Sequence, residues 1–210
     1  IAVIMFFISR QSEIHKANSR DAYMAVTLSW VVFTLFGTLP YLFSGTIPSF
    51  VNAYFESTSG FTTTGSSILT DVEIMPFSIL FWRSLTHWIG GLGIIVLVLI
   101  ILPSLRVSGY QLFSLESSMK EKIHPRTQAI GFRILFIYLG LSFSQIILLS
   151  LGDMNLFDSI CHSFGTIATG GFSTKNLSRA AYSPYSQYIV MIFMFVAGTS
   201  QVVFYYLFKL

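Results

Sequence analysis

The sequence is poor in charge and in cysteine, and each shortage excludes a class of protein. Charged residues make up 10% of the 210 residues, whereas an average soluble chain carries about 25%. Such a low charge excludes an ordinary soluble domain, a disordered tail and a basic arm that binds nucleic acid. The one cysteine, Cys161, excludes a disulfide framework within the chain.

Apolar residues are abundant instead. They make up 53% of the chain and include 21 Phe, and the mean hydropathy is +0.71. A helix needs about 20 mostly apolar residues to cross the hydrocarbon core of a bilayer. Four stretches meet this requirement: 22–43, 77–102, 132–151 and 185–207. The sequence therefore predicts an all-α integral membrane protein with the lipid bilayer as a partner and no nucleic-acid partner.

Basic residues are distributed unevenly between the connections. Seven Lys and Arg residues lie on one side of the predicted spans, in 10–20 and 103–131, and two lie on the other, Lys175 and Arg179. Because Lys and Arg are enriched in cytoplasmic loops, the first side is predicted to be cytoplasmic. The chain begins at Ile1, and residues 1–8 are apolar but too short for a span. We therefore expect an internal piece of a longer membrane protein.

Each outer connection contains a short segment of about half a span. Residues 49–59 and 155–166 suit helices of about 11 residues, or about 16 Å. Asn155 is a suitable N-cap, with Asp158 three residues later. Apolar segments this short are typical of re-entrant or interfacial helices. A pair of amphipathic helices on the membrane surface is the alternative, and length alone does not separate the two.

A segment rich in Thr and Gly follows each short helix. The first Thr-Gly strip is residues 60–67 (GFTTTGSS), and the second Thr-Gly strip is residues 165–174 (GTIATGGFST). An offset of 105 residues pairs Gly60 with Gly165, Thr64 with Thr169 and Gly65 with Gly170. The order of span, short helix, strip and span therefore occurs twice, which is the pattern of an internal repeat.

These features predict a pair of pore loops. A short helix that enters the membrane aims its C-terminus, with about half a negative charge, at the bilayer centre, where it favours a cation. The strip then returns as extended backbone, which is tolerated at that depth where it lines a water-filled path or is buried in protein. Its carbonyls can replace the hydration shell of a cation. Turns rich in Gly, Ser and Thr are the ordinary alternative. Potassium-type filters are closed by a ring of four loops. Two loops do not close such a ring, so a second copy of the chain or two further repeats are expected.

Four stretches together resemble one family of transporters. They are 53–66 (AYFESTSGFTTTGS), 82–103 (WRSLTHWIGGLGIIVLVLIILP), 122–127 (KIHPRT) and 157–174 (FDSICHSFGTIATGGFST). The sequence resembles the membrane subunit of the Trk/Ktr/HKT superfamily of potassium transporters and is most similar to its bacterial TrkH-like branch. The resemblance covers the chain from residue 10 to its end.

The resemblance implies a potassium-channel-like pore of four span–pore loop–span repeats in one chain, of which about two are present here. Residues 1–21 then contain the end of a preceding helix and a cytoplasmic link, 22–102 the first repeat, 103–130 a cytoplasmic linker and 131–210 the second repeat. Members of the family build the filter from backbone carbonyls, which here belong to Thr63, Thr64, Gly65, Ala168, Thr169 and Gly170. Gly65 favours potassium, since some plant members have serine at that position and favour sodium.

The resemblance also implies potassium uptake by a multi-pass protein of the bacterial inner membrane. Such a protein is not an enzyme, and we expect the transported potassium ion and no organic cofactor. Family members usually work as homodimers with a cytosolic nucleotide-binding regulatory subunit. A sodium-coupled or sodium-permeable cation transporter of the same superfamily, a secondary transporter with broken helices and a non-conducting helical scaffold are the alternatives.

Polar residues within the spans have structural and functional interpretations. Arg83 either reaches the outer interface beside Trp82 or has a structural partner near the filter, for which Glu56 is the obvious candidate. His87, one turn from Arg83, is either a pH sensor or a buried histidine with its bonds satisfied. There is no H-E-x-x-H zinc pair and no Gly-x-Ser-Gly strip of an intramembrane protease, so no catalytic site is expected.

Overall fold

The computed structural model describes residues 19–96 and 126–199 of the chain. Every element in these two ranges is helical. The elements are α2 (Ser19–Phe43), α3 (Phe50–Phe61), α4 (Phe77–Val96), α7 (Arg126–Ser150), α8 (Leu156–Ile167), the 3-10 helix η2 (Ser178–Ala181) and α9 (Pro184–Gly198). The segment before residue 19, most of the predicted linker 103–130 and the ends of two predicted spans lie outside the described residues.

Local sequence explains where the helices of the second half begin. Asn155 caps α8, because its Oδ1 accepts a hydrogen bond from the backbone N–H of Asp158 at 2.7 Å, as the sequence predicts. α9 begins at Pro184 directly after Ser183, and a first-turn proline loses no helical hydrogen bond.

Both α3 and α8 contain 12 residues, which is about 18 Å. Each short helix is therefore long enough to cross about half of the hydrocarbon core.

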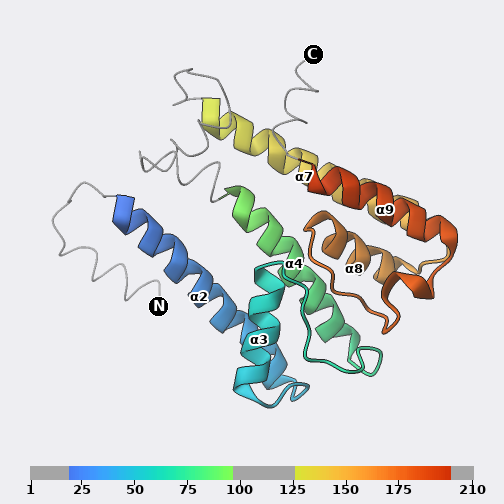
Figure 1. The fold of residues 1–210 in the computed structure, drawn as a ribbon, viewed down its shortest axis with the longest axis horizontal. Coiled ribbons are helices and arrows are strands. Elements are labelled where there is room, and N and C mark those ends of the chain that lie inside the picture. Colours follow the sequence, from blue (N-terminus) through green and yellow to red (C-terminus); the bar gives the residue numbers. More distant parts are fainter. Residues whose placement is uncertain (1–18, 97–125, 200–210) are drawn as a thin grey trace.

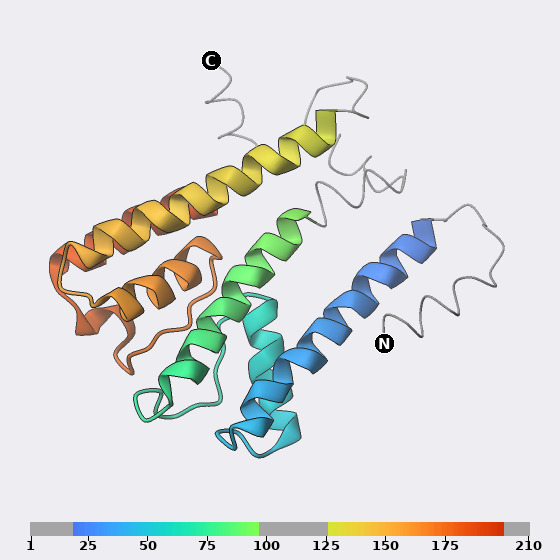
Figure 2. The ribbon, with the colours of Figure 1, turned by 180° about the vertical axis from the view of Figure 1, so that it is seen from behind.

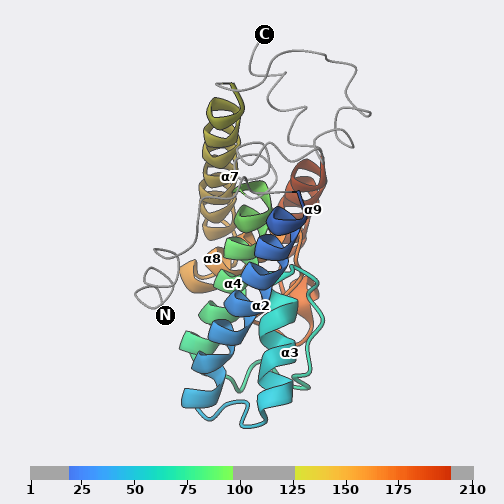
Figure 3. The same cartoon turned by 90° about the vertical axis from the view of Figure 1, so that its left-hand side faces the viewer.

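The helices form two groups that meet at α4. α3 packs against α2 and α4, while α8 packs against α7, α9 and α4. Figure 1 shows α4 with one short helix on either side, and Figure 2 shows the same arrangement from behind. The axes of the long helices α2, α4 and α7 are roughly parallel, with the chain in α4 running opposite to α2 and α7, and Figure 3 shows the three helices from the side. This packing holds the C-terminal ends of both short helices against the middle of α4.

Two of the described helices are long and apolar enough to cross a membrane, at Val26–Phe43 in α2 and Phe132–Ser150 in α7. They coincide with the first and third predicted spans. The described part of α9, Pro184–Gly198, is apolar but shorter than a span. Large apolar side chains are exposed along these helices: Phe33, Phe36, Phe136, Phe143 and Phe195. Such faces suit contact with lipid tails or with further membrane helices.

Candidate functional site

Each short helix is followed by a backbone turn of the same kind. Thr63 and Thr169 have positive φ angles of 54° and 53°, in a region that β-branched residues rarely adopt. The next residues, Thr64 and Gly170, each donate a backbone N–H to a carbonyl five residues earlier, at 3.0 and 2.9 Å. Strained backbone of this kind is typical of ligand-binding segments.

The two turns correspond at an offset of 106 residues, not 105. Thr63 corresponds to Thr169 in φ, and Gly65 corresponds to Gly171, with positive φ angles of 77° and 140°. The first and last residues of α3 and α8 differ by the same offset. The offset predicted from sequence is therefore one residue too short. The second strip contains two adjacent glycines, and sequence alignment alone favours Gly170 as the counterpart of Gly65.

The two strips approach each other at their glycines. A Cβ atom on Gly65 would lie 2.8 Å from the carbonyl oxygen of Gly170. Because Gly65 also has a φ of 77°, both its backbone angle and its surroundings require glycine. Gly170 is covered from the other side by the ring of His87, which a Cβ atom at position 170 would overlap. The structure thus brings together the two glycines of the predicted filter.

The carbonyls of the two turns have no protein donor. Within the described part of the chain, no hydrogen bond is donated to the carbonyl oxygens of Thr63, Thr64, Ala168 or Thr169. Backbone carbonyls away from water require a partner, so these oxygens are free to accept water or a cation. The Thr64 hydroxyl lies 2.8 Å from the hydroxyl of Thr62, which adds side-chain oxygens to the first strip. Neutral oxygens of this kind are the ligands of alkali-cation filters.

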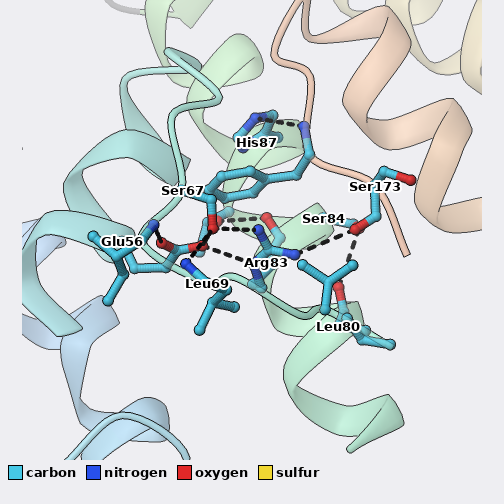
Figure 4. Close-up of polar contacts among 12 residues, drawn as sticks. Glu56, Ser67, Leu69, Leu80, Arg83, Ser84, His87 and Ser173 are labelled. Atoms are coloured by element: carbon cyan, nitrogen blue, oxygen red, sulfur yellow. Dashed lines mark hydrogen bonds and ion pairs between the residues drawn. The ribbon is translucent and has the colours of Figure 1, made fainter. Parts of the chain in front are cut away.

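Arg83 of α4 and Glu56 of α3 form a buried ion pair behind the first strip. The Nε atom of Arg83 lies 2.8 Å from Oε1 of Glu56, and both side chains are at most 2% exposed. Glu56 also accepts hydrogen bonds from the Ser67 hydroxyl at 2.9 Å and from the Ile68 backbone N–H at 3.1 Å. Figure 4 shows the pair and Ser67 together. The structure thus brings together the two residues that the sequence suggests as partners.

The second strip is held by Asp158, an acidic residue that the sequence pattern connects only with the start of α8. The hydroxyl of Thr174 donates to Oδ1 of Asp158 at 2.6 Å and lies 3.4 Å from Nε2 of His162. Arg179 of η2 donates to the Thr166 hydroxyl at 3.2 Å. One signal could have identified this role: Asp158 is the one acidic residue of α8, as Glu56 is the one acidic residue of α3.

One face of α4 lies against the ends of both short helices. A Cβ atom on Gly90 would overlap the carbonyl group of Phe61, the last residue of α3, and the Cβ of Ala168 lies 3.0 Å from a Cβ built on Gly91. These two glycines therefore permit close helix approach. His87 is buried on the same face, and its ring stacks on Phe172 with 4.1 Å between centroids.

Asn176 joins the outer parts of the two loops. Its side chain accepts from the Val72 backbone N–H at 2.8 Å and donates to Asp71 at 2.7 Å, while its own N–H donates to Glu73 at 3.1 Å. These segments are more than 100 residues apart in the sequence. The three hydrogen bonds therefore connect the first and second loops outside the strips.

Replacing Asn176 with alanine is expected to loosen this connection. The Val72 amide loses its acceptor, so its hydrogen exchange should accelerate at least about fivefold, the size expected for one lost hydrogen bond. Hydrogen exchange followed by mass spectrometry measures this rate. Asn52→Ala, at an exposed position of α3, is the matched control and should leave the exchange of Val72 unchanged. An unaltered rate in Asn176→Ala would contradict the connection.

Asp153 holds the start of α9. Its carboxylate accepts hydrogen bonds from the Ser186 hydroxyl at 2.5 Å and from the Ser183 hydroxyl and backbone N–H, both at 2.7 Å. The hydroxyls of Ser186 and Ser183 lower the pKa of Asp153 from its ordinary value of 3.8 to about 2. The ionised carboxylate is therefore the form that stabilises the fold.

The contribution of Asp153 to stability is expected to depend on pH. It is fully present above the ordinary pKa of about 4 and is lost as the pH falls toward about 2. The wild type should therefore melt at a higher temperature than Asp153→Asn at neutral pH, and this difference should shrink on acidification. Thermal unfolding in detergent at several pH values measures it. A difference that stays constant down to the lowest pH would contradict the assignment.

Comparison with known proteins places the chain in one family. It matches the family described as TrkH, cation transport protein, over residues 2–209. It is 38% identical over 199 residues to the Trk system potassium uptake protein TrkH of Escherichia coli strain K12, covering 92% of this chain and 41% of that protein. It is 39% identical over 175 residues to the Trk system potassium uptake protein TrkI of Halomonas elongata, covering 83% of this chain and 36% of that protein.

A solved structure shows the same fold. The crystal structure of the potassium transporter TrkH from Vibrio parahaemolyticus matches with a TM-score of 0.71 and 36% sequence identity. The match covers 87% of this chain and 37% of that chain. The chain thus spans about two fifths of the length of the curated relatives and of this structure.

Proposed function

The chain belongs to the TrkH family of cation transport proteins, and we propose that it provides two span–pore loop–span repeats of a four-repeat pore for potassium uptake. The first repeat is 22–102 and the second is 131–210, joined by the cytoplasmic linker 103–130. Residues 1–21 contain the end of a preceding helix and its link to the first repeat. The chain is not an enzyme, since the family transports ions.

The observation that carries the proposal is the set of carbonyls without protein donors at the ends of two half-span helices. In the proposed filter, the backbone carbonyls of Thr63, Thr64, Gly65, Ala168, Thr169 and Gly170 bind potassium. The C-terminal ends of α3 and α8 add partial negative charge next to these carbonyls. The filter therefore needs no charged ligand, and the transported ion is the one bound species that the mechanism requires.

Potassium is the cation that this arrangement favours. Carbonyl oxygens held at fixed positions replace the hydration shell of the ion. Gly65 holds the first strip in a conformation that serine cannot adopt without strain. The relatives carry the name potassium uptake protein, which supports the same ion. A sodium-permeable transporter of the same superfamily and a non-conducting scaffold are the alternatives.

We propose that the whole protein has the location and the partners that its family membership suggests. It is a multi-pass protein of the bacterial inner membrane that works as a homodimer with a cytosolic nucleotide-binding regulatory subunit. The exposed apolar side chains of α2, α7 and α9 support contact with lipid or with further membrane helices. The basic residues of 103–130 support a cytoplasmic position for the linker.

Rubidium tracer uptake into liposomes that contain the full-length protein tests this function. With the regulatory subunit and nucleotide supplied, we expect uptake above that of empty liposomes, reduced more strongly by excess potassium than by excess sodium. Equal competition by both ions would favour the sodium-permeable alternative. No uptake by correctly folded protein would overturn the pore and favour the scaffold.

A further inference from the structure

We propose that Arg83 sets the distance between the two Thr-Gly strips and thereby helps to determine which cation the pore prefers. This inference rests on the proposed function and adds a positioning residue to it. Arg83 is 1% exposed, so it acts from behind the strips through the groups that it contacts.

Arg83 contacts both strips with one guanidinium group. Its Nη2 donates to the Ser67 hydroxyl of the first strip at 3.1 Å, and its Nη1 donates to the Ser173 carbonyl of the second strip at 3.3 Å. Its Cζ lies 4.1 Å from the centre of the Phe172 ring, also in the second strip, which is a cation–π distance. Figure 4 shows Arg83 between Ser67 on one side and Ser173 on the other.

The position of the guanidinium is fixed by Glu56. A buried cation is stable only when it has a partner charge and satisfied hydrogen bonds, and Oε1 of Glu56 lies 2.8 Å from Nε of Arg83. Because the guanidinium is a rigid planar fork, fixing Nε on Glu56 also fixes the directions of Nη1 and Nη2. The positions of Ser67 and Ser173 are therefore defined relative to each other.

The separation of the strips bears on selectivity because filters distinguish cations by the arrangement of their carbonyl oxygens. The strips come from distant segments and approach closely at Gly65 and Gly170. Arg83 has two separable roles, to neutralise the charge of Glu56 and to position the strips. If neutralisation were its only role, any cationic side chain that reached Glu56 could replace it. Lysine separates the two roles, since it keeps the charge but lacks the fork that reaches several acceptors in fixed directions.

The test compares Arg83→Lys with Trp82→Phe in the full-length protein with its regulatory subunit. Trp82 is the neighbour of Arg83, and its indole N–H donates to the Gly37 carbonyl of α2 at 3.0 Å. Within the described residues it makes no hydrogen bond to either strip. We expect Arg83→Lys to lower the ratio of rubidium to sodium uptake at least about tenfold, the size of one hydrogen bond to a charged group. Trp82→Phe should lower thermal stability and leave this ratio unchanged.

The outcomes separate this inference from the proposed function. A selective wild type with an unchanged ratio in folded Arg83→Lys, or an equal fall in Trp82→Phe, would overturn the role of Arg83 and leave the pore intact. A wild type without cation uptake would overturn both. If Arg83→Lys does not fold, Phe172→Leu decides, because it removes the ring contact to the second strip and keeps the pair with Glu56. A lower ratio in that variant supports the proposal, and an unchanged ratio overturns it.

Discussion

Replacing Gly65 with serine is expected to remove most of the preference of the pore for potassium over sodium. A side chain at position 65 meets the Gly170 carbonyl, and the φ of 77° is unfavourable for any residue with a Cβ atom. Left-handed backbone costs a non-glycine residue about 1–2 kcal/mol. The first strip should therefore relax, and the carbonyls of both strips should move out of the arrangement that suits potassium.

The ratio of rubidium to sodium uptake in liposomes measures this effect, and we expect a fall of at least about tenfold, which corresponds to about 1.4 kcal/mol. Gly45→Ser is a closely matched control. Gly45 has a similar φ of 67°, lies in the connection between α2 and α3, and has no atom within 4 Å of the place that a Cβ would occupy. This variant carries the same backbone strain away from the strips and should keep the wild-type ratio. An unchanged ratio in Gly65→Ser, or an equal fall in Gly45→Ser, would contradict the filter.

Gly90→Ala is expected to be among the most destabilising additions of a single methyl group. The new Cβ would overlap the carbonyl group of Phe61 at the end of α3, and backbone atoms cannot move aside as the end of a flexible side chain can. Overpacking of this kind costs about 1–3 kcal/mol. Because one face of α4 contacts the ends of both short helices, the shift should also disturb the backbone turn at Thr63, which follows α3.

Thermal unfolding in detergent measures the loss, with Gly140→Ala as the control. Gly140 lies in α7, and no atom lies within 4 Å of a Cβ built on it. Alanine is favoured over glycine within a helix by about 1 kcal/mol, so Gly140→Ala should melt at or above the wild-type temperature. A Gly90→Ala variant as stable as the wild type would contradict the close approach of Gly90 in α4 to the Phe61 carbonyl group of α3.

The short helices and one buried contact can be predicted from sequence because their signals are local or have few alternatives. Asn155 and Asp158 are three residues apart, which identifies the start of α8. Glu56 and Arg83 are opposite charges in apolar surroundings, so each is the obvious partner of the other. Their ion pair at 2.8 Å agrees with that suggestion.

The contacts between the two halves cannot be predicted in the same way. The hydrogen bonds from Arg83 to Ser173 and from Val72 to Asn176 join residues 90 and 104 positions apart. They depend on how two groups of helices pack around α4, which no local pattern specifies. The offset between the strips shows the same limit, since sequence matching favours Gly170 and the backbone angles favour Gly171 as the counterpart of Gly65.

Anomalous diffraction from crystals of the full-length protein, grown with rubidium in place of potassium, tests whether the carbonyls of the two strips hold the transported cation. We expect an anomalous peak in direct contact with the carbonyl oxygens of Thr63 and Thr169, weakened when sodium replaces rubidium. A fully occupied rubidium site elsewhere in the membrane region, with no peak between the strips, would contradict a filter formed by their carbonyls.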